Sequence, residues 1–194
     1  MDAIKLKTPV LDRLTDEEFF EFCQDHRDLR IERAADHQIT IMPPASSESG
    51  SSNSEIISDL VIWNRQHKLG KTFDSSASFT LSTGATLSPD ASWIAQARWD
   101  ALSADERRGF ARICPDFVVE LLSPSDRLTD AMRKMEHWLE AGARLAWLIA
   151  PASESVFVFE PNRPVRPLQG FDQPLSGEPL LPGFALELRR LRPI

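Results

Sequence analysis

Three charged residues stand where the surrounding apolar pattern does not account for them: Asp90, Glu120 and Lys134. Glu120 lies within PDFVVELLSP, an almost entirely apolar run between two prolines that is typical of a buried strand. Burying an unpaired carboxylate is costly, so such a group usually becomes neutral, pairs with a cation or holds a metal ion. We interpret Glu120 as a metal ligand.

A metal site at Glu120 needs a second carboxylate, and the sequence offers two. Asp116 shares a strand face with Glu120, but at ~3.3 Å per residue the two lie roughly 13 Å apart. One Mg²⁺ cannot bridge them, because its oxygen ligands bind at about 2.0–2.1 Å. Asp90 follows a proline at the start of a different strand and can lie beside Glu120. We therefore take Asp90 as the partner and Asp116 as a strand-start residue.

Lys134 lies on the helix predicted to follow the Glu120 strand, about 100° from the centre of that helix's apolar stripe. A lysine on this flank can reach back over the sheet, although on helix geometry alone extension toward water is the commoner outcome. Two carboxylates from neighbouring strands and a lysine are the components of metal-assisted phosphodiester hydrolysis. The carboxylates fix a divalent cation that activates water, and the lysine orients the water or stabilises developing negative charge.

The N-terminal third is predicted to form a helix, a hairpin and a second helix. Thr15 and Glu18 make a capping box for a helix from Asp16 to about His26. Residues 29–33 and 38–42 alternate as paired strands do, and the Ser-rich stretch 45–54 is typical of a loop. A helix with a broad apolar stripe then runs from about Ser54 to His67.

The remaining pattern predicts strands separated by one long helix. The expected elements are strands at 71–81 and 86–96, a short helix and loop at 97–114, the Glu120 strand, a helix at 127–141 capped by Asp126, and strands at 145–149 and 156–159. From Pro161 the chain is Pro-rich and is expected to pack irregularly. The core order is helix, strand, strand, strand, helix, strand, which predicts an α/β fold with a mixed α+β sheet.

The length and composition fit one soluble domain spanning 1–194, with an N-terminal helix and hairpin at about 15–44, a core at about 54–160 and a C-terminal segment at 161–194. A net charge of −7 argues against coating nucleic acid by bulk electrostatics, but leaves room for a locally basic site. No apolar run nears the ~20 residues of a membrane span, and the N-terminus lacks a signal-peptide core. We expect a cytoplasmic protein with no membrane partner.

Cysteine and histidine usage argues against a histidine-rich zinc site. The two cysteines form no CxxC pair, and the four histidines form no HxxxH or HxH pair. The chain has no tyrosine, which excludes a tyrosine nucleophile.

The core order and the Asp–Glu–Lys set resemble the PD-(D/E)xK nuclease superfamily. Within it the chain is similar to the Uma2 (DUF820) family of restriction-endonuclease-like proteins, over roughly residues 10–190. The similar segments are LRIERAADHQITIMPP, NSEII, FDSSASFTLSTGATLSPDASWI, CPDFVVELLSPSD, RKMEHW and GARLAWLIAP. The resemblance implies a catalytic set of Asp90, Glu120 and Lys134, a Mg²⁺ or Mn²⁺ cofactor, and DNA as the substrate.

Several positions depart from the superfamily or family pattern or add to the site. Leu122 stands where the superfamily has its lysine, and in Uma2-like proteins that lysine has moved to the following helix, which Lys134 fits. Glu32 matches a family glutamate, and Glu55 lies on a helix where many superfamily members carry a metal-associated glutamate. We therefore add Glu32 to the candidate catalytic set and Glu55 to the candidate metal ligands, with an ordinary surface carboxylate as the alternative for each. His37 replaces a frequent family glycine, and Ala150 a frequent aspartate.

Two functions remain open on these grounds. The first is a Mg²⁺- or Mn²⁺-dependent endonuclease, which as a homodimer would cut both DNA strands, although the sequence leaves the oligomeric state open. The second is a catalytically silent protein that uses the same fold for binding or assembly, which the acidic charge and the lack of a recognition module favour.

Overall fold

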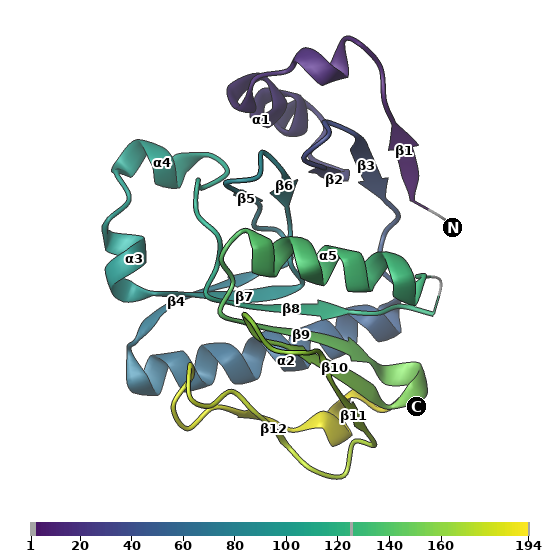
Figure 1. Ribbon diagram of the computed structural model, residues 1–194, viewed down its shortest axis with the longest axis vertical. Coiled ribbons are helices and arrows are strands. Elements are labelled where there is room, and N and C mark those ends of the chain that lie inside the picture. The colour runs from purple at the N-terminus through teal and green to yellow at the C-terminus, as the bar shows by residue number, and fades with distance from the viewer. Residues whose placement is uncertain (1–2, 125, 194) are drawn as a thin grey trace.

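The computed structural model describes residues 3–124 and 126–193, and its centre is a six-stranded mixed sheet (Figure 1). The strand order is β11-β10-β9-β8-β7-β4, in which β8 and β9 are parallel and the other neighbours antiparallel. These strands are β4 (Gly70–Asp74), β7 (Ala91–Ala95), β8 (Phe117–Leu121), β9 (Leu145–Ala150), β10 (Ser155–Phe159) and β11 (Arg166–Gln169). The predicted mixed α/β class and core order are confirmed.

Two long helices cover opposite faces of this sheet. Helix α2 (Ser47–His67) packs on one face through Ile56, Leu60 and Trp63, and α5 (Leu128–Glu140) packs on the other through Met135 and Trp138. Because successive strand residues point to opposite faces, Glu120 in β8 faces the α5 side while Val119 and Leu121 face the α2 side.

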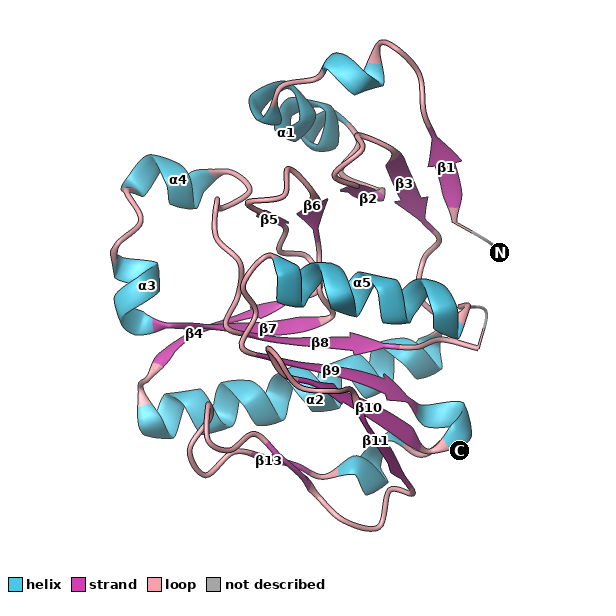
Figure 2. Ribbon diagram, in the orientation of Figure 1, coloured by secondary structure: helices cyan, strands magenta, loops and turns pink. Residues whose placement is uncertain are grey.

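A second, five-stranded sheet lies on the α5 side of the molecule (Figure 2). Its strand order is β1-β3-β2-β6-β5. The N-terminal part supplies the strands β1 (Ile4–Leu6), β2 (Arg30–Arg33) and β3 (Ile39–Met42), and the core segment supplies β5 (Phe79–Thr80) and β6 (Thr86–Leu87). The 3₁₀ helix η1 (Leu11–Arg13) and the helix α1 (Asp16–Asp25) lie between β1 and β2 in the chain. The predicted capping box of α1 and the β2–β3 hairpin are both present. His37, at the hairpin turn, has φ of 63°, which explains why a glycine suits this position.

The remaining elements close the edges and the α2 face. They are α3 (Gln96–Asp100), α4 (Ala104–Arg108), η2 (Pro151–Ser153), β12 (Leu175–Ser176), β13 (Ala185–Leu186) and η3 (Leu188–Leu191). The C-terminal segment is not irregular as predicted, because it supplies β11 to the central sheet and the β12–β13 pair. The proline in β11 is tolerated because this is an edge strand. The segment also adds Phe171, Phe184 and Leu191 to the core under α2. In the ranges described, no helix combines the length and apolar character that crossing a membrane requires.

Four further local predictions are wrong, two strands, a loop and a helix cap, and each has a physical reason. The predicted strands 71–81 and 86–96 each divide between the two sheets, because Asp74 accepts the Ser76 N–H in a turn and Pro89 has no N–H for a ladder. The loop predicted at 45–54 is largely helix, since Ser46 caps α2 by accepting the Ser49 N–H at 3.1 Å.

Asp126 does not cap α5 as predicted. Its carboxylate accepts the Ser123 N–H at 2.8 Å, and Arg127 occupies the N-cap position without a side-chain cap.

Candidate functional site

Glu120 is buried at the α5 face of β8, with 8% of its surface exposed. The indole N–H of Trp138 donates to its Oε1 at 2.8 Å. The ammonium of Lys134 lies 2.9 Å from Oε1 and 3.1 Å from Oε2. The carboxylate therefore has both a cation and a neutral donor, which together offset much of the cost of its burial.

Lys134 reaches over the sheet instead of extending into solvent. Its side chain is 17% exposed. Besides Glu120, its Nζ donates to Glu32 Oε1 at 2.8 Å and to the Ser88 carbonyl at 3.1 Å. All three N–H donors of the ammonium can thus be satisfied within one cluster.

Glu32 comes to this cluster from β2 of the second sheet. Its Oε1 accepts the Ser88 backbone N–H at 3.0 Å as well as the Lys134 ammonium. Ser88 precedes Pro89 at the point where the chain passes from one sheet to the other, so the junction between the sheets lies at the carboxylates.

Asp90 lies directly beside Glu120, at the start of β7. Its backbone N–H donates to the Val119 carbonyl at 3.0 Å, and its Oδ2 accepts the Leu121 N–H at 2.8 Å. Its Oδ1 faces Arg30, whose Nη1 is 3.1 Å away, while Arg30 Nη2 donates to the Ser88 carbonyl at 2.7 Å. The cluster therefore holds Asp90, Glu120 and Glu32 against two cations, Lys134 and Arg30.

Burial and charge together raise the pKa of Glu120 and of both basic residues in this cluster. Burial raises the pKa of Glu120 to about 7, against the pull of Lys134, and Asp90 and Glu32 add to the rise. Burial acts to lower the pKa of Lys134 and Arg30, but the carboxylates outweigh it and raise both. Both bases thus stay cationic, and Glu120 can gain a proton near neutral pH.

The structure does not bring Glu55 into the cluster. Glu55 lies on α2, on the opposite side of the central sheet, and its carboxylate faces Arg190 at 3.7 Å. The helix that carries it packs on the other face of the central sheet, so this geometry gives no support to the predicted metal role of Glu55.

Asp116 also lies apart, at the other end of β8. It is fully buried, pairs with Arg98 at 3.0 Å and Arg144 at 3.6 Å, and accepts the Ala95 N–H at 2.9 Å. These contacts are consistent with the prediction that Asp116 is a structural residue at the start of the strand and not a partner of Glu120 in a metal site.

Sequence reasoning missed two members of the site, although each had a signal. Arg30 is two residues before Glu32, so the two share one face of β2. Trp138 is four residues after Lys134, so the two share one face of α5. In both cases the side chain could have been assigned to the site from its spacing to a predicted site residue, but not from its residue type.

The donor set suits a hard divalent cation, although it is not assembled around one. Among the residues described, no group of three His, Cys, Asp or Glu side chains forms a ready-made metal site. However, the Leu121 N–H holds Asp90 Oδ2 while Asp90 Oδ1 faces Arg30. The Trp138 N–H holds Glu120 Oε1, and the Lys134 ammonium contacts both Glu120 oxygens. Carboxylate oxygens oriented in this way are the ligands that Mg²⁺ and Mn²⁺ prefer.

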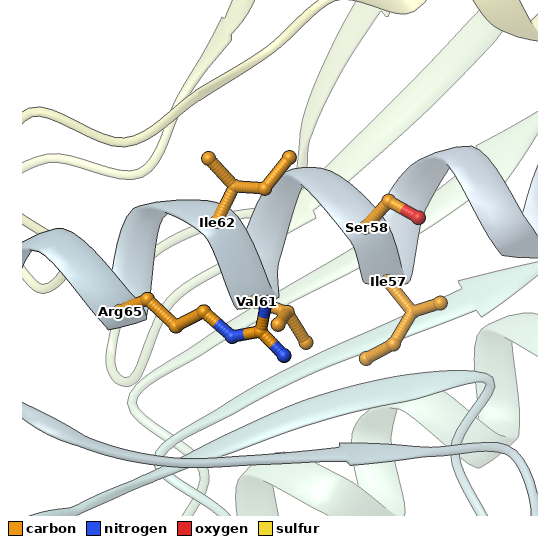
Figure 3. Close-up of a pocket in the computed structure, with 5 residues that line it drawn as sticks. All are labelled: Ile57, Ser58, Val61, Ile62 and Arg65. Atoms are coloured by element: carbon orange, nitrogen blue, oxygen red, sulfur yellow. The ribbon is translucent and has the colours of Figure 1, made fainter.

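A shallow depression on α2 lies on the opposite side of the central sheet from these carboxylates. Its lining consists of Ile57, Ser58, Val61, Ile62 and Arg65, which Figure 3 shows along the helix. It contains no carboxylate, so it offers no ligand set comparable with the cluster at Glu120.

Comparison with solved structures finds a protein of the same fold. A crystal structure titled as a putative nuclease belonging to DUF820, from Anabaena variabilis ATCC 29413, matches with a TM-score of 0.73 and 21% identity. The match covers 92% of this chain and 97% of that one. The curated proteins contain no match. This chain therefore shares its fold with the Anabaena variabilis protein.

The family follows from the sequence model that matches residues 16–189. This model is Uma2, described as "Putative restriction endonuclease". The chain belongs to the Uma2 family, as the resemblance in its motifs implied.

Proposed function

We propose that this protein is a Mg²⁺- or Mn²⁺-dependent endonuclease that hydrolyses DNA phosphodiester bonds. The observation that carries the proposal is the Lys134 ammonium held on Glu120, 2.9 Å away, with Asp90 on the adjoining strand. An acid pair from neighbouring strands and a lysine that contacts one of the acids are the components this chemistry needs. The family and the fold of its structural neighbour are consistent with it.

Asp90 and Glu120 would hold the divalent cation, which when bound supplies Lewis-acid activation of water and neutralises phosphate charge. The Leu121 N–H and the Trp138 indole orient the two carboxylates by holding one oxygen of each. These donors act as the outer contacts that fix ligand geometry in metal sites.

Lys134 would hold the attacking water or stabilise negative charge that develops on the phosphate. It is positioned for this by Glu32 and the Ser88 carbonyl, which fix the ammonium beside Glu120. Glu32 then acts by orienting Lys134, because the Ser88 N–H and the Lys134 ammonium both bind its Oε1.

A binding protein without catalysis is the second candidate. The observation that favours it is the neutralisation of the carboxylates by Arg30 and Lys134, which holds the cluster together without a metal ion. In that case the cluster only stabilises the junction between the two sheets.

Cleavage of supercoiled plasmid distinguishes the two. We expect nicking by the purified protein to require Mg²⁺ or Mn²⁺ and to fall by about 10²-fold or more in Glu120→Gln and Asp90→Asn. Glu55→Gln, on the other side of the sheet, should retain activity. Metal-dependent cleavage that survives Glu120→Gln would overturn the site assignment, and absence of cleavage with every divalent ion would favour the binding protein.

A further inference from the structure

Arg30 has an unusual place in the cluster, because it bonds the carboxylate that would be a metal ligand. Its Nη1 lies 3.1 Å from Asp90 Oδ1 and its Nη2 donates to the Ser88 carbonyl at 2.7 Å. Its Nε is buried with no hydrogen-bond partner among the described residues. Yet its side chain is 33% exposed, so part of it borders solvent as well as the cluster.

The charge balance of the cluster gives Arg30 two incompatible tasks. Without a metal ion, Asp90, Glu32 and Glu120 pair with two cations among the described residues, Arg30 and Lys134, and Arg30 is the one paired with Asp90. A divalent cation on Asp90 would meet the guanidinium at close range, where like charges repel strongly in a partly buried site. The metal ion and the Arg30–Asp90 bond therefore compete for one oxygen.

We propose that Arg30 is the counter-ion of Asp90 until a divalent cation binds, and that it then contacts a phosphate of the nucleic acid. The inference rests on the proposed function and adds a substrate-contacting residue to it. Released from Asp90, the guanidinium has donors without acceptors, and the Nε already lacks one. A phosphodiester oxygen pair supplies the acceptors that the planar fork of an arginine fits best.

The exchange requires that removing Arg30 affects metal binding and DNA binding in opposite directions. Loss of a competing cation should raise the affinity for the metal ion, whereas loss of a phosphate contact should lower the affinity for DNA. A residue with a structural part alone would weaken both when removed. The two affinities therefore separate this inference from simple damage to the site.

Calorimetric titration with Mn²⁺ alone tests the first half. We expect Arg30→Met and Arg30→Gln to bind Mn²⁺ about tenfold more tightly than the parent protein. Arg30→Gln keeps a donor for the Ser88 carbonyl, so it serves if Arg30→Met folds poorly. Arg190→Met is the matched control, because Arg190 pairs with Asp59 at 3.0 Å away from the cluster and its removal should leave Mn²⁺ affinity unchanged.

Fluorescence anisotropy with a labelled DNA duplex in excess EDTA tests the second half without any metal ion. Asp90→Ala frees Arg30, so we expect it to bind the duplex several-fold more tightly than Asp59→Ala, which removes the same charge elsewhere. Adding Arg30→Gln to Asp90→Ala should abolish that gain. The inference is overturned if Asp90→Ala gains no more than Asp59→Ala, or if the double variant keeps the gain.

The Mn²⁺ titration also separates the two claims. If the parent protein binds Mn²⁺ and both Arg30 variants bind it equally or more weakly, the role proposed for Arg30 is overturned and the metal site stands. Absence of Mn²⁺ binding in the parent and in both variants overturns the metal site of the proposed function together with it. Binding that appears only when Arg30 is replaced supports the competition directly.

Discussion

The ammonium of Lys134 allows Glu32 and Glu120 to be buried within one cluster. Each carboxylate lies within 3 Å of the Nζ, and both are nearly excluded from solvent. Two buried carboxylates without this cation would repel each other, and one would have to take up a proton. The lysine is thus as important to the folded state as to the proposed chemistry.

Replacing Lys134 should therefore destabilise the fold. We expect Lys134→Met to lower the free energy of unfolding by about 3–5 kcal/mol, the usual cost of breaking a buried ion pair from one side. Urea denaturation measures this, and Glu32→Gln combined with Lys134→Met should recover part of the loss. Lys71→Met, at an exposed position of β4, should change stability by no more than about 0.5 kcal/mol. A loss below 1 kcal/mol for Lys134→Met would show that the cluster is open to water.

The raised pKa of Glu120 predicts how metal binding responds to pH. Because burial raises this pKa to about 7, a proton competes with the cation below pH 7 and is lost above it. Stabilisation by a saturating excess of Mg²⁺ should hence be larger at pH 8 than at pH 6. Thermal unfolding with and without Mg²⁺ at both pH values measures the difference, and Glu120→Gln should remove it. An equal or larger shift at pH 6 would contradict the assignment.

At this scale the sequence predicted the acids and the lysine but not their two neighbours. Glu120 could be found because a carboxylate in an apolar strand is conspicuous, and strand spacing and helix position pointed to Asp90 and Lys134. The family resemblance added Glu32. Arg30 begins an ordinary alternating strand, where an arginine is normally a surface residue. Arg30 reaches Asp90 only because the second sheet lies against the central one, and the sequence does not reveal this arrangement.

Helix α5 is the element that positions the site, because it carries both Lys134 and Trp138 on the face toward β8. Trp138 is fully buried and its indole N–H holds Glu120. Trp147 on β9 is equally buried, but its indole N–H has no hydrogen-bond partner in the described ranges. The two tryptophans are therefore equally buried and differ in whether the indole N–H has a hydrogen-bond partner.

This contrast makes a matched pair of substitutions. Trp138→Phe should lower the free energy of unfolding by about 1.5–3 kcal/mol more than Trp147→Phe, because it removes a bond to an ionisable carboxylate. Trp147→Phe removes an unsatisfied donor, which offsets part of the lost packing. Chemical denaturation of both variants gives the comparison. Equal losses would mean that the indole bond to Glu120 contributes nothing to stability.

Long periodic elements were predictable, whereas the divided strands were not. The apolar stripe of α5 and the buried runs at β8 and β9 carry their own pattern. The strands 71–81 and 86–96 look continuous, because residues on both sides of each break alternate alike. The turn at Asp74 and the proline at 89 decide instead, and which sheet each half joins depends on partners far along the chain.

On the scale of the whole molecule, the site lies at the junction of two sheets. The central sheet supplies Asp90 and Glu120, and the second sheet supplies Glu32 and Arg30. Arg33, on the same strand as those last two, anchors the second sheet to α1. It is fully buried, pairs with Asp16, donates to the Leu14 carbonyl at 3.1 Å and lies over the Phe19 ring at 4.7 Å.

Loosening this anchor should loosen β2, the strand that carries Glu32 and Arg30. We expect Arg33→Met to lower the free energy of unfolding by about 3 kcal/mol and to speed hydrogen exchange along β2. Exchange in β9, within the central sheet, should change less. Arg13→Met, at an exposed position of η1, is the control and should change neither. Uniform acceleration across both sheets would show that they open as one unit.

The most direct test of the central claim is the anomalous difference density of Mn²⁺ in crystals of the protein. The account predicts one strong peak between the Asp90 and Glu120 carboxylates, at about 2.1 Å from an oxygen of each, with Lys134 still on Glu32. Arg30 should have moved away from Asp90. No peak at saturating Mn²⁺, with Arg30 and Lys134 still holding both carboxylates, would contradict it.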